Sequence, residues 1–358
     1  MNPDRLTKRN PTKEPMPSIP AHPSILIILM GSLGDVARGL CLVSALKTHF
    51  PGCRISWLIE PKWVELVRLH PQIDNIIVFR RSWRISAVWE LYRNLRQNHF
   101  DITLDLQRIL KSGIFSLFSG AKRRIGFHRR NAKEMNWIFN TEYIASYSDS
   151  LPKILHYLKF AEHIGVPEST SRDFGFASLD IRTVAPPAVL QIQKPFVAIV
   201  LGSSWESKNW RFEGYRQLIQ VILYKWELAV VLLGDYSQIA MSIKLEKTLE
   251  SSDLLNIAGK TVLPELVAVL KCAAAGVGPD SGAGHLAAAV QTPFVTLFGP
   301  TAPDRTAPDG YRHLVVQSET DCAPCYKKSC PGLGQKCMHS IRLECVTAKL
   351  EEALSARC

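Results

Sequence analysis

The chain has 358 residues, of which 46% are hydrophobic and 21% charged, and its formal net charge is +11. This length exceeds what one ordinary core needs, so we expect two domains. No apolar run reaches the about 18 residues of a membrane-spanning helix. The positive charge favours an anionic partner, namely nucleic acid, a membrane surface or a phosphorylated substrate, although a merely soluble basic surface explains it equally well.

Residues 1–24 precede the first apolar run and are rich in lysine, arginine, asparagine and proline. They contain no apolar segment followed by a small-residue cleavage site, so we predict a disordered leader rather than a signal peptide. We therefore expect a cytoplasmic protein.

Short β-type runs alternate with helical periodicity in the first half of the chain, which is typical of parallel α/β layers. The predicted strands are 25–30, 54–59, 75–79, 101–105 and 123–127. Helical patterns between and after them include 36–49, 84–98 and 151–165. These elements predict a first α/β domain over residues 25–170.

A polar, proline-containing stretch follows from about residue 168 and shows no regular element, so we assign 171–194 as a linker. The alternation then resumes over residues 195–358, with predicted strands at 196–201, 228–233, 254–257, 276–278 and 294–298. Two open α/β domains that face each other bind ligands in the cleft beyond the carboxyl ends of their strands.

The stretch GSLGDVARGL, residues 31–40, ends the first strand with two glycines and Asp35. The glycines allow a tight turn, and the carboxylate lies at the start of the following helix on the cleft side. One interpretation is structural, because aspartate is a good helix N-cap. The other is chemical, because a carboxylate in the cleft can accept a proton.

The stretch GVGPDSGAGHLAAAVQTPFVTLFGPTAP, residues 276–303, carries a denser pattern of the same kind. A strand ends at Asp280, and small residues then open a helix whose free N–H groups face the cleft as an anion site. Its candidate ligand-binding residues are Asp280, Ser281, Gly282, Gly284 and His285. Packing of small residues against a sheet explains the alanines of this stretch. It does not explain why the turns Asp-Ser-Gly at 280–282 and Gly-Pro-Thr at 299–301 occur together.

A third element, LGSSWESKNW, follows the first strand of the second half. Ser203, Ser204 and Lys208 lie on this loop, where hydroxyls and an ammonium can bind a diphosphate. An isolated loop lysine is more often solvated, so this loop indicates a binding site only in combination with the stretches at 31–40 and 276–303.

Together these stretches resemble glycosyltransferase family 9, the lipopolysaccharide heptosyltransferases, over about residues 25–346. The similar phrases, in chain order, are GSLGDVARGLCLVSALK, DITLDLQRILKS, RRIGF, KNW, LNIAGKTVLPELVAVL, DSGAGHLAAA and TLFGPTAP. The resemblance implies a GT-B fold, two Rossmann-like domains facing across a cleft, with the acceptor on the first and the nucleotide sugar on the second. It also implies inverting transfer of heptose from ADP-heptose to the lipopolysaccharide inner core.

In this interpretation Asp35 is the general base that takes the proton of the acceptor hydroxyl. Lys208, Ser203, Ser204 and the amides after Asp280 stabilise the leaving diphosphate, while Asp280 faces the sugar hydroxyls of the donor. No DxD-type metal motif accompanies these residues, so we expect turnover without a metal or other cofactor.

The sequence departs from its apparent family after the strand at 228–233, where relatives commonly offer a glutamate to the ribose. Here Asp235 and Gln238 are the candidates. A basic segment around 121–133 suggests contacts with an anionic acceptor and with the cytoplasmic face of the inner membrane. Candidate acceptor contacts are Lys111, Arg123, Arg124, Arg129 and Arg130.

Five of the nine cysteines lie between residues 322 and 345. Four of them, Cys322, Cys325, Cys330 and Cys337, have the spacing C-x2-C-x4-C-x6-C. This spacing suits structural zinc or, under oxidation, disulfides, but a reducing cytoplasm disfavours disulfides. Plain structural thiols, structural zinc and a redox function all stay open, and Cys41, Cys53 and Cys272 suit apolar cores.

Other function classes explain less of the sequence. A nucleic-acid binder would interleave its basic residues with stacking aromatics and would not place Asp35 and Asp280 against phosphates. A nucleotide-sugar epimerase, a binding protein or a family member with another donor or acceptor uses the same fold, so the fold alone does not exclude them.

Overall fold

The computed structural model describes residues 19–82, 84–168 and 172–356, in which two parallel sheets are the main framework. The predicted leader lies outside the described residues as far as residue 18. The first sheet has the order β3-β2-β1-β4-β5-β6, and every pair in it is parallel. Its strands are β1 (Ser24–Ile28), β2 (Arg54–Ile59), β3 (Asn75–Val78), β4 (Ile102–Asp105), β5 (Arg123–Gly126) and β6 (Glu142–Tyr143). The five predicted strands are confirmed, whereas the two-residue β6 is too short to give a sequence pattern.

Helices cover both faces of this sheet, so its central strands are buried and nearly uniformly apolar. The helices are α1 (Leu33–His49), α2 (Val64–Arg68), α3 (Ile85–Gln97), α4 (Leu110–Phe118) and α5 (Lys153–His163). Helix α1 begins earlier than predicted because Ser32 is its N-cap and accepts a hydrogen bond from the backbone N–H of Asp35. The N-cap interpretation of Asp35 is therefore wrong, since its side chain lies in the first turn.

The second sheet repeats the strand order of the first. It reads β12-β11-β10-β7-β8-β9, again parallel throughout, which matches the first sheet when its strands are counted from β7. Its strands are β7 (Phe196–Val200), β8 (Ala229–Leu233), β9 (Leu254–Asn256), β10 (Ala275–Pro279), β11 (Phe294–Phe298) and β12 (Val315–Gln317). The main helices around it are α8 (Phe212–Gln220), α9 (Ile239–Leu249), α10 (Leu263–Cys272), α11 (Gly282–Ala289) and α14 (Leu343–Ser355).

The segment between the sheets contains two short helices, α6 (Ile181–Val184) and α7 (Pro187–Leu190), where no regular element was predicted. Each is a single turn, too short for a helical period to appear in the sequence. The Lys271 ammonium on α10 fastens this segment by donating to the carbonyls of Phe176, Ala177 and Leu179. No helix in the described ranges is both long and apolar enough to cross a membrane.

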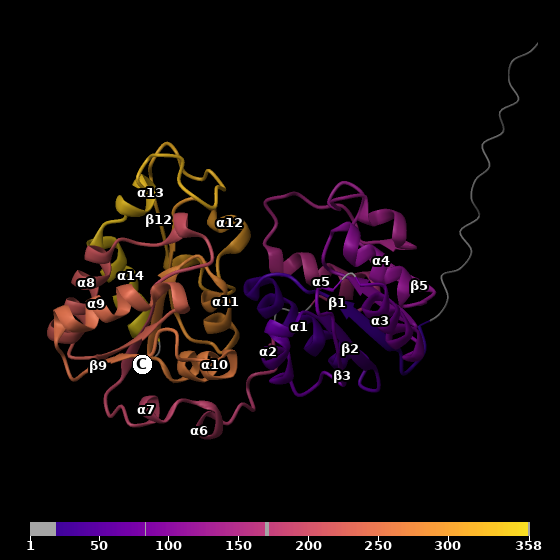
Figure 1. Ribbon diagram of the computed structural model, residues 1–358, viewed down its shortest axis with the longest axis horizontal. Helices are drawn as coiled ribbons and strands as arrows, with labels where there is room; N and C mark the ends of the chain where they lie inside the picture. Colours follow the sequence, from indigo (N-terminus) through magenta and orange to yellow (C-terminus); the bar gives the residue numbers. More distant parts are fainter. Residues whose placement is uncertain (1–18, 83, 169–171, 357–358) are drawn as a thin grey trace, which may run out of the picture.

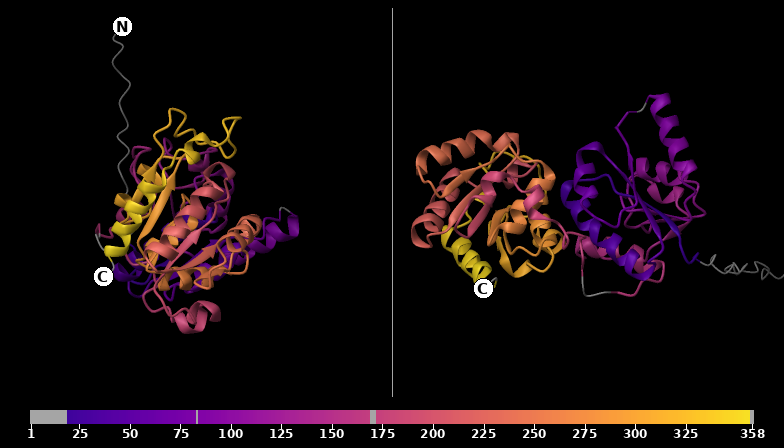
Figure 2. Two further views of the ribbon diagram at one scale, coloured as in Figure 1. Left: turned by 90° about the vertical axis from the view of Figure 1, so that its left-hand side faces the viewer. Right: turned by 90° about the horizontal axis from the view of Figure 1, so that it is seen from below.

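The two domains lie side by side, with the linker helices at one end (Figures 1 and 2). Helices α1 and α2 of the first domain face α11 and α10 of the second. At Gly282 a Cβ atom would lie 2.5 Å from Leu33 Cγ, so the missing side chain allows α11 to approach α1. In each sheet the strand order reverses beside the first strand, between β1 and β4 or between β7 and β10. Ligands bind at such switch points, which directs attention to the loops that follow these four strands.

Candidate active site

Asp35 lies at the switch point of the first domain, in the first turn of α1. Its Oδ1 atom accepts hydrogen bonds from Arg38 at 2.7 Å, Lys153 at 3.1 Å and the Tyr157 hydroxyl at 3.1 Å. Its Oδ2 atom accepts a hydrogen bond from the Ser32 hydroxyl at 2.9 Å. Because Oδ1 already has three donors, Oδ2 is the oxygen with capacity for a further proton.

The charges around Asp35 keep it ionised. Burial by itself raises its pKa, but the Lys153 and Arg38 cations and their hydrogen bonds outweigh burial and hold the pKa well below its usual range. Burial lowers the pKa of Lys153, and Asp35 opposes that change. The sequence did not single out Lys153 or Tyr157, because α5 reaches α1 only through the fold. Arg38 was also missed, although its i,i+3 spacing from Asp35 on one helix was a signal for this ion pair.

Arg38 connects this cluster to the second domain. One guanidinium nitrogen contacts Nε2 of His285 on α11, while another bonds Asp35. Burial, and then the Arg38 charge, lower the pKa of His285 well below its usual value, so the imidazole is neutral and accepts from Arg38. A Cβ atom at Gly34 would lie 2.8 Å from the His285 ring. Gly34 therefore permits this contact between the domains.

Lys208 and Asp280 lie at the switch point of the second domain. The Lys208 ammonium is 2.7 Å from Asp280 Oδ2 and 3.2 Å from the Asp280 carbonyl oxygen. The same Oδ2 accepts from the Thr301 hydroxyl at 2.8 Å. The three turns singled out in the sequence of this domain thus meet, with Lys208 held by Asp280 rather than free in the loop.

The N-terminus of α11 follows Asp280. The Ser281 hydroxyl is buried and has no hydrogen-bond partner within the described part of the chain. Ser203 donates to the Trp205 carbonyl at 3.1 Å, and Ser204 is exposed. Gly284 lies close to Phe294 and Pro308, so its missing side chain also serves packing. The N–H groups of the first turn of α11 and the unpartnered hydroxyl lie near the Lys208 cation and are chemically suited to an anion.

The chain is similar in sequence to proteins of known family. The family description "Glycosyltransferase family 9 (heptosyltransferase)" matches residues 88–335. The chain belongs to glycosyltransferase family 9. It is 28% identical over 320 residues to lipopolysaccharide heptosyltransferase 1 of Pseudomonas aeruginosa, covering 86% of this chain and 87% of the relative. It is also 28% identical to the core heptosyltransferase OpsX of Haemophilus influenzae, covering 80% of this chain and 82% of that protein.

The fold of this family member is that of solved heptosyltransferases. The structure of Escherichia coli ADP-heptose lipopolysaccharide heptosyltransferase II superimposes with a TM-score of 0.77 at 21% identity, covering 93% of this chain and 99% of that one. The two facing Rossmann-like domains are therefore the predicted GT-B fold, and the predicted class, a glycosyltransferase, is confirmed by the family.

The ribose candidates of this glycosyltransferase are engaged with each other. Asp235 caps a short helical turn by accepting from the Ser237 N–H, and Gln238 accepts from the Asp235 N–H at 2.9 Å. Gln238 is buried and its amide nitrogen contacts the Ser237 hydroxyl. A ribose contact by either side chain stays a prediction, and Asp235 is the more accessible candidate.

The predicted acceptor contacts fall into two groups. Arg123 is buried in a bidentate pair with Glu142, with N to O distances of 2.7 and 2.8 Å, and Arg124 donates to the Phe139 and Ala121 carbonyls. Both begin β5, away from the carboxyl end where a cleft ligand lies, so this geometry does not support their assignment to the acceptor, which stays a prediction. Arg129 and Arg130 are exposed after β5. Lys111 lies on α4, 3.7 Å from Glu60.

The contribution of the Arg123–Glu142 pair to stability can be tested by varying the pH. Burial by itself raises the pKa of Glu142, but hydrogen bonds from Arg123 and His163 lower it to about 2. An unfolded glutamate titrates near pH 4.3, so between that pH and about 2 the unfolded chain binds a proton at Glu142 that the folded chain does not bind. The contribution of the ionised Glu142 to the free energy of unfolding therefore decreases as the pH falls. Glu142→Gln should therefore flatten the decline in melting temperature between about pH 5 and pH 2. An unchanged slope would mean that the pair contributes nothing to stability.

The cysteine-rich segment lies against the Lys208 turn. Cys322, Cys325, Cys330 and Cys337 all line one cavity of about 180 Å³. Among the described residues, however, no group of three or more Cys, His, Asp or Glu side chains is arranged to hold a metal ion, so the zinc alternative gains no support from this geometry. The described cysteines are free thiols, and Cys41 and Cys53 are buried as predicted. Plain structural thiols agree with this arrangement.

Backbone contacts show what the cysteine-rich segment supports. The Ser207 hydroxyl donates to the Lys327 carbonyl at 2.6 Å, and the Ser207 N–H donates to the Lys328 carbonyl at 3.2 Å. The Gln335 amide donates to the Glu206 carbonyl at 3.1 Å. The segment therefore braces the turn that carries Lys208.

We expect Cys322→Ser with Cys325→Ser to lower the melting temperature, because polar hydroxyls replace thiols in the cavity beside that turn. The folded fraction should keep its turnover, measured as product formed per mole of folded protein. Cys345→Ser, on α14 outside this cavity, is the matched control. Normal melting combined with complete loss of turnover would contradict a structural role.

Proposed function

We propose that this family member transfers heptose from ADP-heptose to an anionic acceptor in the lipopolysaccharide inner core, with inversion at the anomeric carbon. One observation carries the proposal. The turn bearing Asp35 contacts the N-terminus of α11, so a carboxylate of one domain lies beside the anion-binding end of the other. The names of the Pseudomonas and Haemophilus relatives support heptose as the sugar and lipopolysaccharide as the acceptor.

The acceptor hydroxyl is a poor nucleophile until a base takes its proton. In the proposed mechanism Oδ2 of Asp35 takes it while the oxygen attacks the anomeric carbon of the heptose. The cations that bond Oδ1 orient the carboxylate and keep it ionised. They also weaken it as a base, so bound substrate must raise the proton affinity of Oδ2.

The bond between heptose and ADP breaks as the new bond forms, and negative charge grows on the leaving diphosphate. Lys208 and the N–H groups of Gly282 and its neighbours supply fixed positive charge at this end of the cleft. Asp280 holds the Lys208 ammonium in place at 2.7 Å. Loss of the leaving group from the face opposite the attacking oxygen accounts for inversion.

The excess of positive charge on the whole chain suits work beside an anionic membrane surface. The exposed Arg129 and Arg130 are the proposed contacts to acceptor phosphate or to lipid at the cytoplasmic face of the inner membrane.

The test measures ADP release from ADP-heptose with and without a truncated core acceptor, and resolves the sugar products by mass. We expect ADP to appear together with an acceptor enlarged by one heptose, and only when the acceptor is present. ADP release or donor rearrangement without acceptor would instead identify a hydrolase or an epimerase. Replacing ADP-heptose with other nucleotide sugars under the same conditions identifies the donor.

A further inference from the structure

Two further arginines lie near the start of α5 and have no role in the proposed mechanism. Arg108 follows β4 in the first domain, and Arg305 lies in the short helix α12 (Pro303–Thr306) of the second. The Nε atoms of Arg108 and Arg305 and the hydroxyl of Tyr147 are buried, and none has a hydrogen-bond partner among the residues the structure describes. Buried polar atoms are normally paired, so these three groups await a partner.

Ring contacts bring Arg108 to the start of α5. Its guanidinium lies 5.4 Å from the ring centroid of Phe127, and the Phe127 ring is 6.2 Å from that of Tyr147. The Tyr147 ring is in turn 4.1 Å from the ring of His156 on α5. Arg108, Phe127, Tyr147 and His156 are therefore linked by successive contacts that end on α5.

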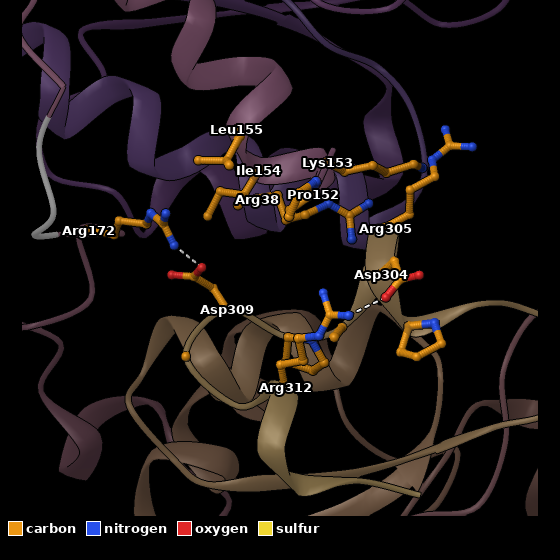
Figure 3. Close-up of a pocket in the computed structure, with 14 residues that line it drawn as sticks. Arg38, Pro152, Lys153, Ile154, Leu155, Arg172, Asp304, Arg305, Asp309 and Arg312 are labelled. Carbon is orange, nitrogen blue, oxygen red and sulfur yellow. Dashed lines mark hydrogen bonds and ion pairs between the residues drawn. The ribbon is translucent and has the colours of Figure 1, made fainter. Parts of the chain in front are cut away.

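Arg305 of the other domain also approaches the start of α5, because it lines a cavity with Pro152 and Lys153. It lines a cavity of about 170 Å³ between the domains together with Arg38 and Lys153 (Figure 3). The positive charge of Arg305 lowers the pKa of Lys153, Tyr147 and His156. The charge of Arg108 lowers the pKa of Tyr147 and His156. Burial raises the pKa of Tyr147 to about 12 despite both arginines, so the phenol remains a hydrogen-bond donor.

Neighbouring arginines differ from Arg108 and Arg305 in having a carboxylate partner, although Nε of Arg172 is likewise buried without a hydrogen bond within the described residues. In the same cavity Arg172 pairs with Asp309 and Arg312 pairs with Asp304 (Figure 3). Arg108 and Arg305 have no such ion pair in the described ranges. Two guanidinium groups and a phenol that converge without a carboxylate are suited to bind an anion from outside the chain.

We infer that Arg108 and Arg305, with the Tyr147 hydroxyl, bind one anionic group of the acceptor, a carboxylate or a phosphate, from opposite sides of the cleft. This inference rests on the proposed function. Lys153 is 3.1 Å from Asp35 and lines the cavity with Arg305, so the bound anion anchors the acceptor while its hydroxyl faces Oδ2 of Asp35. Arg305 belongs to the donor domain, and the acceptor charge therefore ties the two domains together.

The experiment compares three acceptors: a truncated core acceptor, the same acceptor with its sugar carboxylates methyl-esterified, and the same acceptor after phosphatase treatment. Arg108→Gln and Arg305→Gln are each expected to raise the acceptor KM at least tenfold, because a charge-assisted hydrogen bond is lost, while the Kd for ADP stays unchanged. The increase should disappear with the acceptor that lacks the recognised group. That arm identifies the group as carboxylate or phosphate.

Arg312→Gln is the matched control, because Arg312 lines the same cavity but already pairs with Asp304. Arg108→Lys and Arg305→Lys, which keep the charge, should recover part of the acceptor affinity. That recovery would show that the effect of the glutamine variants is not a folding defect. Equal KM increases for charged and neutralised acceptors, or weaker ADP binding, would overturn the inference.

Failure of the proposed function is distinguishable from this result. If the parent protein does not transfer heptose, calorimetric titration of the ADP-loaded protein with the three acceptors still compares parent and variants. Acceptor affinity that is independent of acceptor charge in the parent would also overturn the inference, whatever sugar is transferred.

Discussion

Asp35→Asn is expected to reduce turnover by about 10²- to 10⁴-fold, because an amide cannot take the acceptor proton at Oδ2. Donor affinity should change little, since Lys208 and α11 belong to the other domain. Ser32 caps the helix, so the substitution leaves the cap intact, but it removes the negative charge that faces Arg38 and Lys153. A lower melting temperature is therefore expected as well. Donor calorimetry, thermal melting and acceptor-dependent ADP release measure the three quantities.

Asp74→Asn separates the loss of a base from the loss of an ion pair. Asp74 also accepts from a lysine, Lys47 at 2.8 Å, and from the Ile55 N–H, but it lies at the start of β3 and away from the cleft. It should lower stability without reducing the turnover of the folded protein. Transfer by the folded Asp35→Asn protein at close to the parental rate would show that the base lies elsewhere.

Lys208→Ala is expected to reduce kcat/KM at least tenfold. Hydrogen bonds to charged groups contribute about 1.5–3 kcal/mol, and the leaving diphosphate loses its cation in this variant. The buried Asp280 also loses its partner at 2.7 Å, which leaves an uncompensated carboxylate near the diphosphate and adds to the loss. Steady-state kinetics and ADP calorimetry measure both parts.

Lys208→Arg restores the positive charge and should recover part of the activity. Lys194→Ala is the control for loss of a lysine from an ion pair, because Lys194 bonds Asp253 at 2.7 Å on the exposed surface. Kinetics of Lys208→Ala equal to those of Lys194→Ala would remove Lys208 from the donor site.

Five strands of each sheet were predictable, and the central ones are short apolar runs buried on both faces. The turns at Asp35, Asp280 and Lys208 were predictable for a related reason, since they follow such strands directly. The linker helices α6 and α7 and the edge strands β6 and β12 were not predicted, because two to four residues cannot show a period.

Two of the three partners at Oδ1 of the candidate base could not be predicted from the sequence, whereas Arg38 lies only three residues after Asp35 on α1. Lys153 and Tyr157 lie more than a hundred residues after Asp35, and only the packing of α5 on α1 brings them to its Oδ1 atom. Arg123 and Arg124 have partners that were not anticipated from the sequence. Their position in a basic segment suggested a surface role, but the pleat of β5 turned Arg123 inward to Glu142.

The contact between Arg38 and His285 makes the electrostatics of the base depend on the distance between the domains. One guanidinium group bridges Asp35 in the first domain and His285 in the second. A substitution at His285 therefore alters the surroundings of the candidate base from the opposite domain, although the two side chains lie 250 positions apart in the sequence.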